Sequence, residues 1–134
     1  IFDVSSVQGR DIDITDINWD KISSDSFVIF YTNFIEKFEY ASKEYFSNHP
    51  QISYDLINLL IEKKVSIIGL DFAGMRRGDE HPVWDKKCAD NNTFVVENLC
   101  NLKQILDLPK DFIVNTYPMN FEGFSGLPCR VIIE

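Results

Sequence analysis

Short apolar runs separated by polar segments indicate the strands of this chain. Residues 26–32 are nearly all β-branched or aromatic on both faces, and residues 65–71 continue in the same way. A strand without polar alternation is typical of a parallel sheet that is covered on both sides. Four further runs predict strands at residues 1–4, 93–97, 111–115 and 128–133.

Helical periodicity is clearest after Pro50 and Ser53. Apolar side chains then recur with a period of about 3.6 residues, which predicts an amphipathic helix ending near residue 64. Weaker patterns predict a short helix capped by Thr15, partly helical structure at residues 33–45 and a short helix at residues 98–106.

The segment between the strands at 65–71 and 93–97 is long, polar and contains glycine. We expect it to be mainly a loop, with a helical turn after Pro82. The alternation of strands and helices along the chain predicts an α/β fold. No internal repeat or linker divides the sequence, so we expect residues 1–134 to form a single domain.

Composition narrows the possible functions. Thirteen basic and twenty-one acidic side chains give a net charge of −8, which argues against nucleic-acid binding because phosphate contacts need clustered Lys and Arg. No apolar run approaches the ~18 residues of a membrane span. The three cysteines, Cys88, Cys100 and Cys129, form no Cys-x-x-Cys pair, which favours reduced thiols and a cytoplasmic location.

Several predicted strands end on a polar side chain. Thr32, Asp71 and Glu97 close three of them, and Asn115 closes a fourth. Parallel strands bring their carboxyl ends to one edge of the sheet, where open α/β folds place ligands. A carboxylate such as Glu97 after a buried strand needs a partner; a cation is one candidate, and an ion pair with Arg130 or Arg76 is the other.

The two histidines occupy different settings. His81 lies in the polar segment between two strands, where side chains carry chemistry more often than in the core. His49 immediately precedes Pro50 and the long helix, so we expect a structural role for it. The sequence has no Gly-x-Gly-x-x-Gly or Walker loop and no Gly-x-Ser-x-Gly motif, which argues against nucleotide binding and a serine hydrolase.

Three segments together resemble a known family. They are residues 67–74 (IIGLDFAG) followed by His81 and Asp85, residues 94–102 (FVVENLCNL), and residues 117–132, which end in PCRVI. Residues 48–53 (NHPQIS) add a fourth match. The combination is similar to the cyclase and bacterial kynurenine formamidase family, whose fold is a swivelling β/β/α domain with a mixed sheet and flanking helices.

The resemblance implies a metal site. By position, Glu97 matches a carboxylate ligand of the family and His81 matches a histidine that binds a second metal in two-metal members. Zinc or manganese, as one or two ions, is the implied cofactor. The family's main metal motif, His-x-Gly-Thr-His-x-Asp, does not occur in these residues. The start at Ile1 rather than Met agrees with a missing N-terminal segment that carries this motif. Without the motif we expect an incomplete metal site and no assignable catalytic residue. We therefore expect little activity of this chain alone.

The resemblance also implies a function. Family members hydrolyse amide bonds of small molecules through metal-bound hydroxide, either an aryl formamide such as N-formylkynurenine in tryptophan catabolism or a cyclic amide. The alternative is a non-catalytic binding or scaffold protein that keeps the fold. A homo-oligomer, dimer or tetramer, is expected. By location, Phe72, Met75, Trp84 and Phe121 are candidate pocket residues, and we expect Asp71 to orient the neighbouring loop rather than to bind metal.

Overall fold

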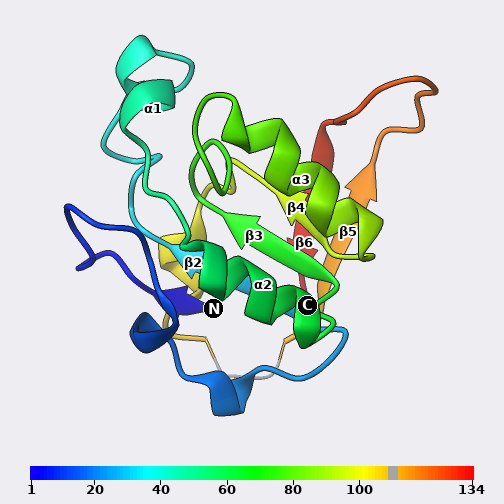
Figure 1. Cartoon of the computed structure of the whole chain (residues 1–134), viewed down its shortest axis with the longest axis horizontal. Helices are drawn as coiled ribbons and strands as arrows, with labels where there is room; N and C mark the ends of the chain where they lie inside the picture. Colours follow the sequence, from blue (N-terminus) through cyan, green and yellow to red (C-terminus); the bar gives the residue numbers. More distant parts are fainter. Residues whose placement is uncertain (109–111) are drawn as a thin grey trace.

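The computed structural model describes residues 1–108 and 112–134. Its main sheet has four parallel strands in sequence order: β1 (Phe2–Asp3), β2 (Phe27–Tyr31), β3 (Ile67–Leu70) and β4 (Phe94–Val96). Strands β5 (Val114–Pro118) and β6 (Cys129–Ile133) form a separate antiparallel ribbon. The predicted α/β class is confirmed, and its mixed character comes from a parallel sheet with a separate ribbon beside it (Figure 1).

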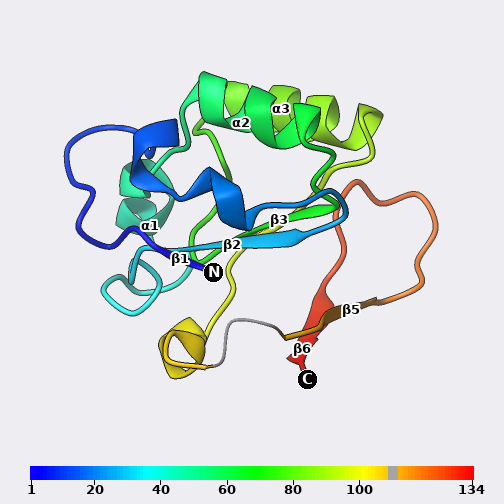
Figure 2. The same ribbon diagram turned by 90° about the horizontal axis from the view of Figure 1, so that it is seen from below.

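Both faces of the parallel sheet are covered, as the continuous apolar runs predict. Helices α2 (Tyr54–Glu62) and α3 (Glu80–Asp90) lie over one face, while η3 (Leu102–Ile105) and the β5–β6 ribbon lie on the other (Figure 2). Strand β2 shows the consequence. Val28 and Phe30 pack into the cluster beneath α2, and Ile29 and Tyr31 pack into the cluster on the η3 side. Every side chain of this strand therefore needs to be apolar or aromatic.

Helix α2 follows the predicted pattern closely. Its N-cap is Ser53, whose hydroxyl accepts a hydrogen bond from the backbone N–H of Leu56 at 3.2 Å. Leu56, Ile57 and Leu60 are fully buried. Burial of such side chains stabilises the fold by about 1.5–3 kcal/mol each, so the amphipathic face fixes α2 against the sheet.

Several expected elements differ in detail. Thr15 does not cap a helix: it lies inside the 3-10 turn η1 (Ile14–Asp16), which Asp13 caps, and a second turn, η2 (Trp19–Lys21), follows it. Residues 33–45 are mostly turns before α1 (Lys43–Asn48). The helix expected at residues 98–106 is limited to η3. Of the strand expected at 111–115, Asp111 lies outside the described residues, and the strand observed there is β5.

The largest difference is α3, which spans eleven residues where mainly a loop is expected. Pro82 is its third residue, and a proline in the first helical turn removes an N–H that has no partner within the helix. The helix is not amphipathic, and Cys88 is its one buried residue. The helix lies against β4, but its sequence shows no hydrophobic period from which a helix could be predicted.

Candidate metal centre

Helix α3 presents two of the candidate ligands on one face. His81 and Asp85 are four residues apart in the first half of the helix, and side chains at this spacing are neighbours on a helix surface. Nε2 of His81 lies 2.8 Å from Oδ2 of Asp85. Each of the two side chains is about one-third exposed, at 34%, so the pair borders solvent and is open to a ligand.

The third candidate ligand, Glu97, directly follows β4. Its backbone position is fixed by the next two residues: the N–H of Asn98 donates to the carbonyl of Phe72 at 3.2 Å, and that of Leu99 to the carbonyl of Leu70 at 2.8 Å. Asn98 has a left-handed backbone with φ of 58°. Its side-chain oxygen accepts a 2.6 Å hydrogen bond from the hydroxyl of the buried Tyr45. The chain therefore turns sharply after Glu97 and leaves this carboxylate at the sheet edge.

His81, Asp85 and Glu97 converge on one point. Nε2 of His81 is 2.8 Å from Oε1 of Glu97 as well as from Asp85, and one donor atom from each residue lies within 4.8 Å of the others. A ring nitrogen carries at most one proton, which cannot point at two oxygens. Within the described residues, Oδ1 of Asp85 is buried without a hydrogen-bond partner, and the buried Oε1 of Glu97 contacts Nε2 of His81 without hydrogen-bond geometry. Such orphaned oxygens are costly unless a cation satisfies them.

Gly74 makes room for the imidazole. It has a φ of +112°, and a Cβ added there would lie 2.8 Å from Cε1 of His81 and 3.0 Å from each ring nitrogen. Any larger residue would crowd the ring and push it aside. The backbone at residue 74 therefore forms a cradle for the side chain whose nitrogen faces the two carboxylates.

The donor set fits a divalent cation. One imidazole nitrogen and two carboxylates suit zinc or manganese, and catalytic zinc sites typically use three protein ligands with one open position. Without a cation, Asp85 and then Glu97 raise the pKa of His81 to about 10, against the opposing effect of its partial burial. A histidine ligand must lose that proton, so cation binding and protonation compete for Nε2.

The groove beside these residues has a volume of about 1100 Å³. His81, Asp85 and Glu97 line it together with Tyr40, residues 98–102 and residues 125–131. The ligand side chains therefore face a space large enough for a small molecule.

Thr32 and Asp71 form a separate buried pair. Both backbone N–H and Oγ1 of Thr32 donate to the Asp71 carboxylate, the latter at 2.6 Å. Burial raises the pKa of Asp71, and the hydrogen bonds from Thr32 oppose this shift. Asp71 thus ties the ends of β2 and β3 together; the role expected for it, orienting the loop near the ligands, stays a prediction. Asn115 lies within β5, away from this edge, so the expectation that it closes a strand of the same sheet is wrong.

The remaining sequence-based candidates have structural contacts. His49 caps the C-terminus of α1, and its Nδ1 lies 2.7 Å from the carbonyl oxygen of Pro50. Phe72 and Met75 are fully buried in the core, and Phe121 is exposed. The alternative partner for Glu97 is not Arg76, since Arg76 pairs with Asp11 and Glu80.

Asp85 was not among the predicted ligands. The i, i+4 spacing from His81 was its available signal, and that spacing carries information only once residues 80–90 are known to be helical.

Fold and donor set together define an α/β domain with a candidate cation centre at the end of its parallel sheet. The chain belongs to the cyclase family: the family described as "Putative cyclase" matches residues 1–76. The predicted resemblance is thereby confirmed. The matched residues end before His81, so the assignment of the three ligands depends on geometry.

Two solved structures share the fold. One, described as a potential metal-dependent hydrolase with cyclase activity, aligns with a TM-score of 0.73 and 24% identity over 98% of this chain and 61% of its own. The other, a predicted metal-dependent hydrolase from Bacillus stearothermophilus, aligns with a TM-score of 0.73 and 23% identity over 98% and 60%. The chain thus spans about three-fifths of their length. Comparison with curated proteins gives no match.

Proposed function

We propose that this chain carries a metal centre of a metal-dependent hydrolase that cleaves amide bonds of small molecules. The convergence of Asp85 Oδ2 and Glu97 Oε1 on one ring nitrogen of His81, at 2.8 Å each, carries the proposal. Membership in the cyclase family and the fold shared with two metal-dependent hydrolases support it.

Each side chain has a defined part in this proposal. His81 offers the Nε2 lone pair, and Asp85 and Glu97 supply negative charge that balances the cation. A zinc or manganese ion, when bound, supplies Lewis-acid polarisation of a carbonyl and of water. Gly74 keeps the imidazole close to the backbone, and Asn98 with Tyr45 keeps the turn after Glu97 in place.

The substrate class is proposed from the family resemblance: an aryl formamide such as N-formylkynurenine, in tryptophan catabolism, or a cyclic amide. Three ligands without the family's Gly-Thr-His motif make a partial centre, so we propose that this chain alone has little activity. A cytoplasmic location is part of the proposal and agrees with the free thiols of Cys88, Cys100 and Cys129. No helix in the described part of the chain is long and apolar enough to cross a membrane.

Metal binding is the decisive test. Isothermal titration of the chain with Zn²⁺ and Mn²⁺ should show saturable binding that Glu97→Gln and His81→Gln weaken strongly. Asp90→Asn on the same helix is the matched control, because Asp90 pairs with Lys86 at the far end. Stoichiometric binding that is insensitive to both ligand substitutions would refute the site. Cleavage assays with N-formylkynurenine and with a cyclic amide then test the substrate separately.

The β5–β6 ribbon supports a homo-oligomer, dimer or tetramer, as part of the proposal. Tyr117, Met119, Phe121 and Phe124 are each more than half exposed on or beside the ribbon. Exposed aromatic patches of this kind commonly mark contact surfaces. Sedimentation equilibrium that gives a monomer at high concentration would contradict an oligomer.

A further inference from the structure

The direction of α3 determines whether His81 and Asp85 face Glu97. Apolar burial on this helix is limited to the buried Cys88 and to Trp84, which packs partly buried against the core. Asp79, at the N-cap, makes no side-chain capping hydrogen bond. The contacts that Glu80 and Trp84 make in the first two turns therefore contribute much of its orientation.

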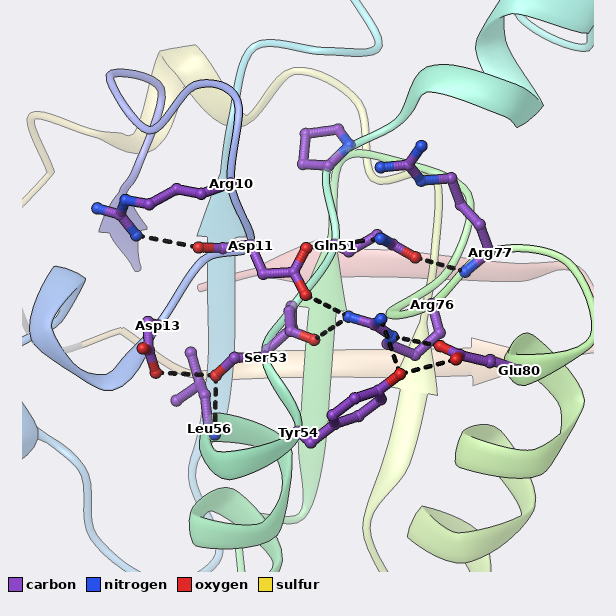
Figure 3. Close-up of polar contacts among 12 residues, drawn as sticks. Arg10, Asp11, Asp13, Gln51, Ser53, Tyr54, Leu56, Arg76, Arg77 and Glu80 are labelled. Carbon is purple, nitrogen blue, oxygen red and sulfur yellow. Dashed lines mark hydrogen bonds and ion pairs between the residues drawn. The ribbon is translucent and has the colours of Figure 1, made fainter.

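Arg76 holds the first turn. Its side chain is only 8% exposed, and its Nε donates to Oε2 of Glu80 at 2.8 Å. Nη1 of the same guanidinium donates to Oδ2 of Asp11 at 2.5 Å and to the carbonyl of Ile52 at 3.0 Å. Figure 3 shows this guanidinium between the N-terminal segment, the start of α2 and Glu80. The first residue of α3 is thus joined to two distant parts of the chain.

Tyr54 contacts the first turn of α3 through Glu80 and the second turn through Trp84. Its hydroxyl donates to Oε1 of Glu80 at 2.7 Å and accepts from Nη2 of Arg76 at 3.1 Å (Figure 3). The guanidinium lies 4.2 Å from the centre of the Tyr54 ring. The other partner of this ring is Trp84, stacked at 5.0 Å with an interplanar angle of 19°.

Helical geometry links these contacts to the ligands. Glu80 and Trp84 form one i, i+4 stripe, and His81 and Asp85 form the next stripe, rotated by about 100°. Fixing the first stripe against Arg76 and Tyr54 therefore fixes the rotation of α3 that turns the second stripe toward β4. A small rotation about the helix axis would move both ligands away from Glu97 together.

We propose that Arg76 and Tyr54 are positioning residues of the metal centre: they set the rotation of α3 through Glu80 and Trp84. This inference rests on the proposed function, since it concerns the same site. Arginine is required for the role because its planar fork reaches three directions at once, whereas lysine is a point charge.

The test compares cation affinity in conservative variants. Arg76→Lys keeps the charge, and Tyr54→Phe keeps the ring while it removes the hydroxyl. Arg77→Lys is the matched control, because the hydrogen bond of the Arg77 side chain goes to the carbonyl of Ser47 rather than to α3. A second control, Ile57→Val, lowers stability in the core by about 0.5–1.5 kcal/mol without touching the centre.

Co²⁺ is the probe, since its absorption spectrum reports ligand geometry. We expect Arg76→Lys to raise the Kd for Co²⁺ by about 10- to 100-fold, as loss of outer-shell partners typically does, and to change the spectrum. Tyr54→Phe should have a smaller effect in the same direction. Arg77→Lys and Ile57→Val should match the wild type. Equal Kd values in Arg76→Lys, Tyr54→Phe and the wild type would overturn the inference, as would an equal loss in either control.

Hydrogen exchange of the cation-free chain separates this inference from the proposed function. The inference requires the amides of α3 to exchange faster in Tyr54→Phe and Arg76→Lys, relative to those of α2. Absence of Co²⁺ binding by the wild type would refute the metal centre, while the exchange measurement would still decide the positioning role. Unchanged exchange in Tyr54→Phe overturns that role even where Arg76→Lys does not fold.

Discussion

Gly74 offers the sharpest test of the geometry around His81. In Gly74→Ala, the new methyl group would lie 2.8 Å from Cε1 and 3.0 Å from both nitrogens of the imidazole. The ring has to move about 0.6 Å to bring the shortest distance from 2.8 to the 3.4 Å of ordinary contact. Positions of metal ligands tolerate only about 0.2 Å, so the substitution displaces Nε2 well beyond that tolerance.

Two effects of Gly74→Ala can be separated. The positive φ of 112° is unfavourable for alanine and should lower the free energy of unfolding by about 1–3 kcal/mol. The displaced ring should in addition raise the Kd for Zn²⁺ by at least about 10-fold, the lower end of the effect seen when the support of a ligand is lost. The first effect is a backbone property, and the second belongs to the metal centre.

Gly78→Ala is the matched control. Gly78 also has a positive φ, of 58°, but a Cβ there meets no atom within 4 Å. Urea unfolding should show lower stability in both variants, whereas calorimetric titration with Zn²⁺ should show weaker binding only in Gly74→Ala. If the two variants bind Zn²⁺ equally tightly, the imidazole of His81 is not held at the ligand position, and the assignment of the centre is wrong.

Three further predictions concern Thr32, His49 and His81. Thr32→Val removes the 2.6 Å hydrogen bond to the buried Asp71 and should lower the free energy of unfolding in urea by about 1.5–3 kcal/mol. Thr32→Ser keeps the hydroxyl and should lower it less. Equal losses of stability in the two variants would contradict the role of that bond. Burial lowers the pKa of His49 from 6.5 to about 4. The folded state thus binds this proton less readily than the unfolded state, and stability should be complete above pH 6.5 and fall by roughly 3 kcal/mol as the pH drops to about 4; His49→Gln should lack this part of the pH profile. Cation binding should release a proton from His81, because the pKa of that residue is about 10 in the cation-free site; titrations in buffers of different ionisation enthalpy measure it, and no release at pH 7.5 would contradict His81 as a ligand.

The apolar sequence patterns were sufficient for the sheet and for α2. Strand β2 is apolar along its whole length because both faces are covered, and such a run is visible without a structure. The end of β4 was equally visible, since Glu97 interrupts an apolar run. These features depend on which local residues are buried, and the pattern of apolar residues along the sequence shows this directly.

Helix α3 and the candidate ligand Asp85 could not be predicted from hydrophobic patterns. The helix buries Cys88 fully and Trp84 in part, so it has no hydrophobic period to detect. Partners such as Asp11 lie 65 residues from Arg76 in sequence, and no local pattern announces them. The pairing of β5 with β6 away from the parallel sheet is likewise a tertiary choice that the two apolar runs do not specify.

The three candidate ligands and the glycine cradle all lie between residues 74 and 97. Assembly of the centre therefore closes only a short stretch of chain, and the entropy of loop closure opposes it little. Contacts of low sequence separation favour fast folding. Within this stretch, the donor atoms need only α3 docked on β4 in the rotation that Arg76 and Tyr54 set, and the β5–β6 ribbon supplies none of them.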